Sequence, residues 1–169
     1  MIRTTRTIGA AVLLVALSSS VQALACECRP PSAPLEEAAQ SDAVFLAKIT
    51  EFKEIRPNNS FVRRLVRKWL FGAPHGGYER EELLVTFQLI QEYKGVDDND
   101  SLVITALSSG ACGYTDFKLN EDFVIYASRD NDGQLHTGLC SRTASASDAS
   151  EDLSVLGEHF PIGREVPHN

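Results

Sequence analysis

Residues 123–140 read FVIYASRDNDGQLHTGLC, two apolar runs on either side of an Asp-Asn-Asp-Gly turn. The runs 123–128 and 134–140 have the composition of strands, and an Asp-Gly pair between two such runs is a strong β-hairpin signal. The acidic turn at 130–133 resembles part of a calcium loop, but it lacks the remaining ligand spacing and the closing Glu. The stretch therefore predicts an antiparallel hairpin with an ordinary turn.

Three further strands are predicted before this hairpin. Residues 43–52 are apolar on both faces, as expected for a strand that is covered on two sides. Residues 82–93 alternate, and one face carries the side chains of Leu83, Val85, Phe87 and Leu89. Residues 102–107 form the shortest of the three.

Two short helices flank the strands, one at 35–40 and one at 147–156 that is closed by Gly157. The predicted fold is therefore mainly β, a five-stranded closed barrel of the oligonucleotide/oligosaccharide-binding type with one helix near each end. Closure removes exposed strand edges, which favours the barrel. A β-sandwich is the alternative.

The first 25 residues have the pattern of a secretory signal: two arginines, an apolar run at 8–17, and small residues up to Ala25. The run is too short for a stable membrane anchor. Ala-Leu-Ala before Cys26 predicts cleavage after Ala25, which gives a secreted, extracellular or periplasmic protein that begins with the free α-amino group of Cys26. A lipidated Cys26 is the alternative, although Ala23 stands where lipoprotein signals usually carry Leu.

Removing residues 1–25 leaves 144 residues (169 − 25), enough for one domain at 26–160 and a loose tail at 161–169. The removed segment holds two arginines and no acids, so the net charge becomes −9 (−7 − 2). This acidic balance argues against a nucleic-acid partner. Four cysteines in an exported chain indicate two disulfides. Their spacing suits neither a zinc site nor a thioredoxin-like redox pair.

An insertion at 53–81 separates the first two strands. Its residues 60–71 have helical periodicity, with Trp69 on the apolar side and a basic side made of Arg63, Arg64, Arg67 and Lys68. Such a helix either packs on the barrel with its charges in water or makes peripheral contact with an envelope or membrane surface.

The four histidines are scattered along the chain, and no nucleophile, base or carboxylate pair is suitably placed. The sequence therefore predicts no enzyme, no catalytic residue, no cofactor and no metal of the protein's own.

Several blocks together resemble a known family. The chain is similar to the amino-terminal domain of the tissue inhibitors of metalloproteinases, within the wider netrin-like group, over about residues 26–145. The blocks are CECRPP (26–31), SDAVFLAK (41–48), YKG (93–95), ACGY (111–114), EDFVIYA (121–127) and DGQLH followed by LCS (132–141).

The resemblance implies a five-stranded barrel with disulfides Cys26–Cys112 and Cys28–Cys140. It implies a monomeric inhibitor whose Cys26 amine and carbonyl chelate the zinc of a target metalloprotease. The implied protease contacts are Glu27, Cys28, Arg29, Pro30, Ser108, Ser109, Gly110 and Ala111. Glu27 stands where the family's inhibitors usually carry a small hydroxyl residue. The alternative is therefore a non-inhibitory netrin-like binding or adhesion module of the cell envelope or extracellular space.

Overall fold

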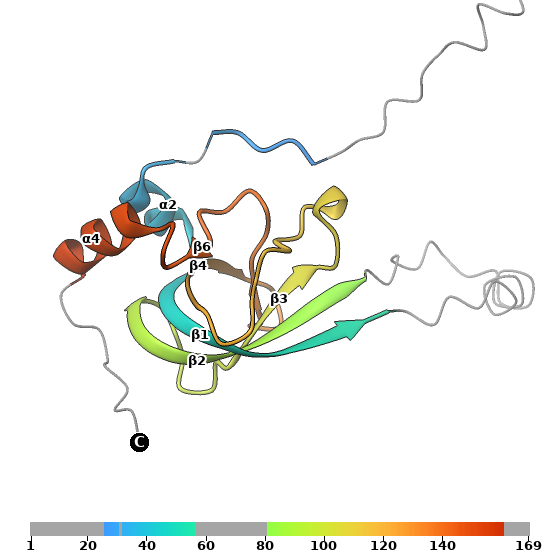
Figure 1. The fold of residues 1–169 in the computed structure, drawn as a ribbon. Coiled ribbons are helices and arrows are strands. Elements are labelled where there is room, and N and C mark those ends of the chain that lie inside the picture. The colour runs from blue at the N-terminus through green and yellow to red at the C-terminus, as the bar shows by residue number, and fades with distance from the viewer. Residues whose placement is uncertain (1–25, 31, 57–80, 161–169) are drawn as a thin grey trace, which may run out of the picture.

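The computed structural model describes residues 26–30, 32–56 and 81–160, and Figure 1 shows their arrangement. The predicted signal peptide, the basic helix at 60–71 and the tail at 161–169 lie outside the described residues. Within those three described ranges, no helix is long and apolar enough to cross a membrane.

The sheet closes on itself. Five strands pair in the order β1-β2-β3-β5-β4, and β4 pairs back to β1. Two helices, α2 (Pro34–Gln40) and α4 (Ser150–His159), lie side by side near the two ends of the described chain (Figure 1). This arrangement confirms the predicted mainly β fold. The strands are Ala43–Ile55 (β1), Glu82–Lys94 (β2), Leu102–Ala106 (β3), Asp122–Arg129 (β4) and Leu135–His136 (β5).

Strand β1 makes the closure possible because it is bent. Its register against β2 shifts at three places along the strand, and each such bulge bends a strand and increases its twist. Residues 43–48 can therefore pair with β4 on one edge while the strand pairs with β2 on the other. Pairing with β2 continues to Ile55, so the strand runs past its predicted end at Phe52.

The predicted hairpin between β4 and β5 is confirmed, with Arg129 opposite Leu135. The backbone N–H of Asp130 donates to the Gln134 carbonyl (3.0 Å), and Gly133 has the positive φ of +80° that the turn requires. One Asp130 carboxylate oxygen accepts the N–H groups of residues 132 and 134, each at 2.9 Å. The acidic side chain therefore closes an ordinary turn.

Strand β5 is shorter than the predicted 134–140. Only Leu135 and His136 pair, and they run parallel to β3. The backbone N–H of Thr137 still donates to the Ile104 carbonyl of β3, and its hydroxyl donates to the Tyr126 carbonyl (2.9 Å each). Residues 138–141 then form a turn that leaves the sheet. A further two-residue strand, β6 (Ala144–Ser145), returns to pair with β4.

The prediction for the last helix was wrong at both ends. A turn occupies residues 145–148, where the Ser145 hydroxyl donates to the Asp148 carboxylate (2.8 Å), so α4 begins only at Ser150. Gly157 lies inside α4, which continues to His159. An exposed glycine weakens a helix by about 1 kcal/mol relative to alanine, and the burial of Leu156 beside it offsets that cost.

The core has two parts. The larger part fills the inside of the ring and includes Phe45, Phe87 and Phe123. The smaller part lies on the outer face of β1 and β4, where α2 and α4 cover Val44 and Tyr126. Strand β1 is therefore buried on both faces over residues 43–47, as predicted. The prediction covered 43–52 and is wrong beyond 47, because Lys48 and Thr50 are exposed. The two helices are placed beside the amino-terminal segment.

Candidate functional site

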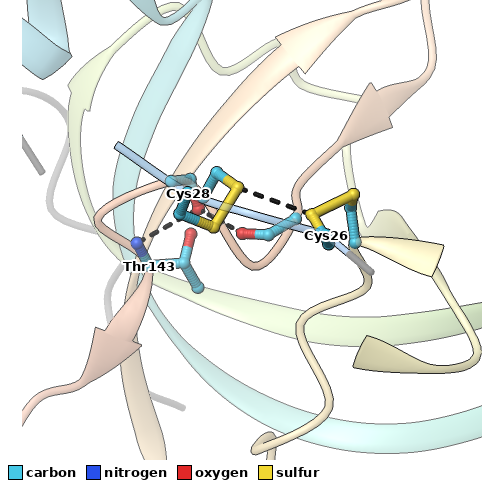
Figure 2. Close-up of a disulfide and its surroundings, with 7 residues drawn as sticks. Cys26, Cys28 and Thr143 are labelled. Atoms are coloured by element: carbon cyan, nitrogen blue, oxygen red, sulfur yellow. Dashed lines mark hydrogen bonds between the residues drawn. A yellow bond between two sulfur atoms is a disulfide. The ribbon is translucent and has the colours of Figure 1, made fainter. Parts of the chain in front are cut away.

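Two disulfides hold the amino-terminal residues 26–30, which have no regular secondary structure. Cys26 is bonded to Cys112 and Cys28 to Cys140, with Cα–Cα distances of 5.2 and 5.1 Å (Figure 2). This is the pairing that the family resemblance implies. The bonded cysteines are 86 and 112 residues apart in sequence. In the chain-entropy model, loops of this length make each bond worth about 4–5 kcal/mol.

The two disulfides touch each other. The Sγ atoms of Cys26 and Cys140 lie 3.7 Å apart, as the dashed line between the yellow sulfurs in Figure 2 marks. The Cys28 sulfur joins them in a group within 4.8 Å. Metal-binding cysteines act as thiolates, and these sulfurs are all in disulfides. These sulfurs therefore cross-link the amino-terminal segment to two loops and do not form a metal site.

Cys112 ends a single turn of 3-10 helix, η1 (Ser109–Ala111), and has a left-handed φ of 65°. The turn is closed by the N–H of Gly113, which donates to the Ser108 carbonyl (3.0 Å). A Cβ on Gly113 would lie 1.8 Å from the Ala106 carbonyl oxygen, so only glycine fits here without displacement. The loop that carries Cys112 is therefore packed tightly against the end of β3.

The loop that carries Cys140 rests directly on the Cys112 loop. The backbone N–H of Leu139 donates to the Cys112 carbonyl (2.8 Å). Gly138 approaches the same carbonyl so closely that a Cβ would lie 2.8 Å from its oxygen. The two loops form one platform, and the amino-terminal segment is covalently bonded to both halves of it.

Three hydroxyl groups fix the base of the Cys140 loop. The Thr137 hydroxyl lies 2.8 Å from that of Thr143 and 3.1 Å from that of Ser141. Thr143 is buried and accepts the backbone N–H of Tyr126 (3.0 Å). Figure 2 shows Thr143 beside the Cys28 end of the disulfide pair. No local pattern predicted this hydroxyl cluster, although Ser and Thr are frequent in the sequence after position 137.

Arg142, two residues after Cys140, links three parts of the chain. It donates from Nη1 to the Ser32 carbonyl (2.7 Å) and from Nε and Nη2 to the Asp152 carboxylate (2.8 Å each). Asp152 lies on α4, is buried, and also accepts the hydroxyl of Tyr126. Burial favours a raised pKa for Asp152, but the hydrogen bonds from Arg142 and Tyr126 outweigh it and hold the pKa below its usual value.

The predicted protease-contact residues form one exposed edge. Cys26 is half-buried, and its disulfide joins two exposed stretches, 27–30 and 108–111. The carboxylate of Glu27 makes no hydrogen bond or ion pair with any residue that the structure describes. The structure thus brings these residues together, whereas Arg63, Arg64, Arg67, Lys68 and Trp69 lie outside the described residues.

A ring of five strands whose amino-terminal segment is held by two disulfides defines a class of small, disulfide-bonded β domains. The family model described as tissue inhibitor of metalloproteinase matches residues 24–152 of this chain. The chain belongs to this family.

The curated relatives are similar at low identity. Metalloproteinase inhibitor 2 of Homo sapiens is 27% identical over 137 residues, which cover 80% of this chain and 56% of that protein. The protein of the same name from Gallus gallus is 27% identical over 157 residues, 92% of this chain and 64% of its own length. That from Cricetulus longicaudatus is 27% identical over 117 residues, 69% and 52%. The chain spans about half to two thirds of the relatives it matches.

The family description and the relatives' names are those of protease inhibitors, not of enzymes. This supports the prediction that the chain is not an enzyme.

Proposed function

We propose that this chain inhibits a zinc metalloendopeptidase by presenting the α-amino group and carbonyl oxygen of Cys26 to the catalytic zinc of the target. The observation that carries the proposal is the fastened, exposed edge made by residues 26–30 and 108–111. Membership of the tissue inhibitor of metalloproteinase family supports the same activity. The edge contacts the protease on both sides of Cys26, through residues 27–30 and 108–111.

The zinc chemistry depends on a free amine. A catalytic zinc keeps one coordination position for water or substrate, and a chelating amine and carbonyl displace that water. An α-amino group has an ordinary pKa of about 7.7–8, so the zinc must displace a proton near neutral pH. Cleavage after Ala25 supplies this amine, in a chain that is secreted or periplasmic. The two disulfides are consistent with an oxidising compartment.

Rigidity is what the disulfides contribute to binding. An inhibitor that is already fixed in its bound shape loses less conformational entropy when it binds. Cys26 and Cys28 are both bonded, so the residue between them cannot swing away from the platform. The amine of Cys26 therefore enters the protease cleft at a fixed position relative to Ser108 and its neighbours.

Glu27 narrows the class of target. Its side chain follows the chelating residue directly and faces the subsite next to the zinc. Burying an unpaired carboxylate in an apolar subsite costs several kcal/mol. The preferred target therefore offers a cationic group at this subsite and accepts an acidic residue after the scissile bond. Proteases with a deep apolar subsite are expected to be poor targets.

The experiment compares two forms of the mature protein, one beginning at Cys26 and one with a single alanine before it. The added residue removes the free amine from the chelating position. We expect the extended form to lose inhibition of the best target by at least about a thousandfold, or roughly 4 kcal/mol. Both forms should show the same melting temperature. Equal inhibition by the two forms would exclude the chelation mechanism.

A panel of zinc proteases with known preferences after the scissile bond provides the targets. Non-reducing intact-mass measurement of the natural protein establishes the first residue, any acyl chain and the number of free thiols. An acylated or longer amino terminus in the natural protein would contradict the proposal.

A further inference from the structure

The segment 28–32 is attached at both ends to neighbouring points of the molecule. Cys28 is bonded to Cys140, and the Ser32 carbonyl accepts a hydrogen bond from Arg142 (2.7 Å). Cys140 and Arg142 are two residues apart, so both ends of the segment are attached to the same loop. Arg29 and Pro30, which lie between the two attachment points, are exposed. The disulfide attaches the Cys28 end of the segment covalently, and the hydrogen bond from Arg142 attaches the Ser32 end.

The Arg142 side chain is itself held firmly. It makes two hydrogen bonds of 2.8 Å to the Asp152 carboxylate, and its side chain is 15% exposed against 7% for that of Asp152. Asp152 belongs to α4, and the hydroxyl of Tyr126 from β4 completes the group. A guanidinium bonds two acceptors in fixed directions, which a lysine ammonium cannot reproduce. The direction from Arg142 to the Ser32 carbonyl is therefore set by the core.

We propose that Arg142 is a positioning residue for inhibition, holding the segment that follows Cys28 in its binding shape and coupling that segment to α4. The proposal rests on the proposed inhibitory function. It assigns a role in inhibition to Asp152 and Tyr126, which lie far from Cys26 in sequence and are buried away from any protease. Without the Arg142 bond, the segment is held only by Cys28 and by α2, whose first residue Pro34 is buried. The backbone between these two points is then freer in the unbound protein and loses more conformational entropy when the protease binds.

A second arginine provides a matched control. Arg129 also bonds an aspartate, Asp100, and two backbone carbonyls, those of Gly95 and Gly133 (2.8 Å each). Its side chain is 22% exposed, close to that of Arg142. Its partners lie in the turns after β2 and between β4 and β5, none of which carries a predicted contact residue. Arg129→Lys disturbs a comparable polar cluster without touching the 28–32 segment.

The test measures hydrogen exchange and inhibition in the same variants. Arg142→Lys should speed amide exchange in a peptide that covers residues 28–36 and weaken inhibition by about tenfold, since a hydrogen bond from a charged donor is lost. Arg129→Lys should change neither reading. A combined variant, Tyr126→Phe, Arg142→Met and Asp152→Leu, controls for the possibility that Arg142→Lys acts only by unfolding the protein. It replaces the buried charges by apolar groups, a change that often preserves stability, and should show the same two effects.

Each outcome decides a different point. Unchanged exchange at 28–36 in the variants overturns the attachment itself. Faster exchange with unchanged inhibition overturns the positioning role, as does equal weakening by Arg129→Lys. If the unmodified protein inhibits no protease in the panel, the proposed function fails and the positioning role falls with it, while the exchange data still decide whether Arg142 holds the segment.

Discussion

Residues 26–30 and the β1–β2 pair are each exposed along part of their length, but different bonds hold them. Strands β1 and β2 pair from Val44 with Lys94 to Ile55 with Glu82, with three shifts of register along the way. The amino-terminal segment has no strand partner and is held by two disulfides, with Ser32 bonded to Arg142 just beyond it. Backbone N–H and C=O groups that are to bind a partner protein cannot also be paired with a neighbouring strand. Side-chain bonds then have to supply the rigidity.

Because different bonds hold the two regions, we expect changes in the β1 core to affect stability alone and changes at the disulfides to affect both stability and inhibition. The β1 side chains fill the core, so a change there lowers the free energy of unfolding and leaves the exposed edge intact in the molecules that remain folded. A change at the disulfides acts on both, because the same bonds constrain the unfolded chain and fix the edge. The predictions below test this separation.

The largest effect is expected from removing the Cys28–Cys140 bond with Cys28→Ala and Cys140→Ala. The free energy of unfolding should fall by about 4–5 kcal/mol, as the chain-entropy model gives for a loop of this length. Inhibition should weaken as well, because residues 27–30 then keep only the Cys26–Cys112 disulfide and the hydrogen bond from Arg142 to Ser32. Urea unfolding and inhibition titrations measure the two effects. Inhibition equal to that of the parent would show that the edge needs only one disulfide.

A comparable loss of stability without loss of inhibition is expected for Phe45→Ala. Phe45 is fully buried on β1, and its ring lies 4.7 Å from that of Phe87. Truncating a buried phenylalanine costs about 3–5 kcal/mol. Inhibition measured well below the melting temperature should match the parent. Leu119→Ala, at a side chain that is 50% exposed, is the control and should change stability by no more than about 0.5 kcal/mol. Weaker inhibition by folded Phe45→Ala would show that the packing of β1 also affects the exposed edge at 26–30 and 108–111.

Local patterns in the sequence were enough to predict strands β1 to β4 and the β4–β5 hairpin, but not β6. Alternation along 82–93 and the two apolar faces of 43–52 are properties of short windows. The burial is as predicted for the first of these and for residues 43–47 of the second. The exposed edge was also predicted, but through the family resemblance of the cysteine blocks rather than through any periodicity.

The errors share a physical cause, which is contact between distant residues. Residues 138–140 have the composition of a strand, yet the turn that brings Cys140 to Cys28 takes them out of the sheet. The bond from Arg142 to Ser32 spans 110 residues and leaves no local signal. Gly157 was interpreted as a helix end because the packing of α4 against β4 cannot be seen in the sequence.

A smaller effect, confined to target choice, is expected for Glu27→Gln. Removing the charge should weaken inhibition of a protease with a cationic subsite by about tenfold and improve inhibition of proteases with apolar subsites. Stability should stay within about 0.5 kcal/mol of the parent, because the Glu27 side chain is exposed. Glu36→Gln, at an exposed residue of α2, removes the same charge elsewhere and should leave the panel unchanged. An equal change across all proteases would argue that Glu27 does not enter the subsite.

The smallest effect is expected from acid, and it concerns how the amino-terminal segment is anchored. Burial favours a raised pKa for Asp152, but its hydrogen bonds from Arg142 and Tyr126 hold the pKa below the ordinary value of about 3.9. A carboxyl with a lowered folded-state pKa contributes stability above its unfolded pKa and loses it as pH falls through the folded value. Thermal melts from pH 6 to pH 2.5 should therefore show little change down to about pH 4 and a decline below it.

The variant Asp152→Asn cannot titrate at this position and isolates the contribution of Asp152. It should be less stable than the parent at pH 6, and the gap should narrow below about pH 4 as the parent loses its charge. Asp100, beside Arg129, also has a lowered pKa and continues to titrate in both proteins, so the parent's decline should be reduced in the variant rather than abolished. Protection of the amides at residues 28–36, taken relative to the intrinsic exchange rate at each pH, should fall with acid in the parent and stay nearly constant in Asp152→Asn. A gap that does not change with pH would mean that the charge on Asp152 does not hold Arg142, and with it the segment, in place.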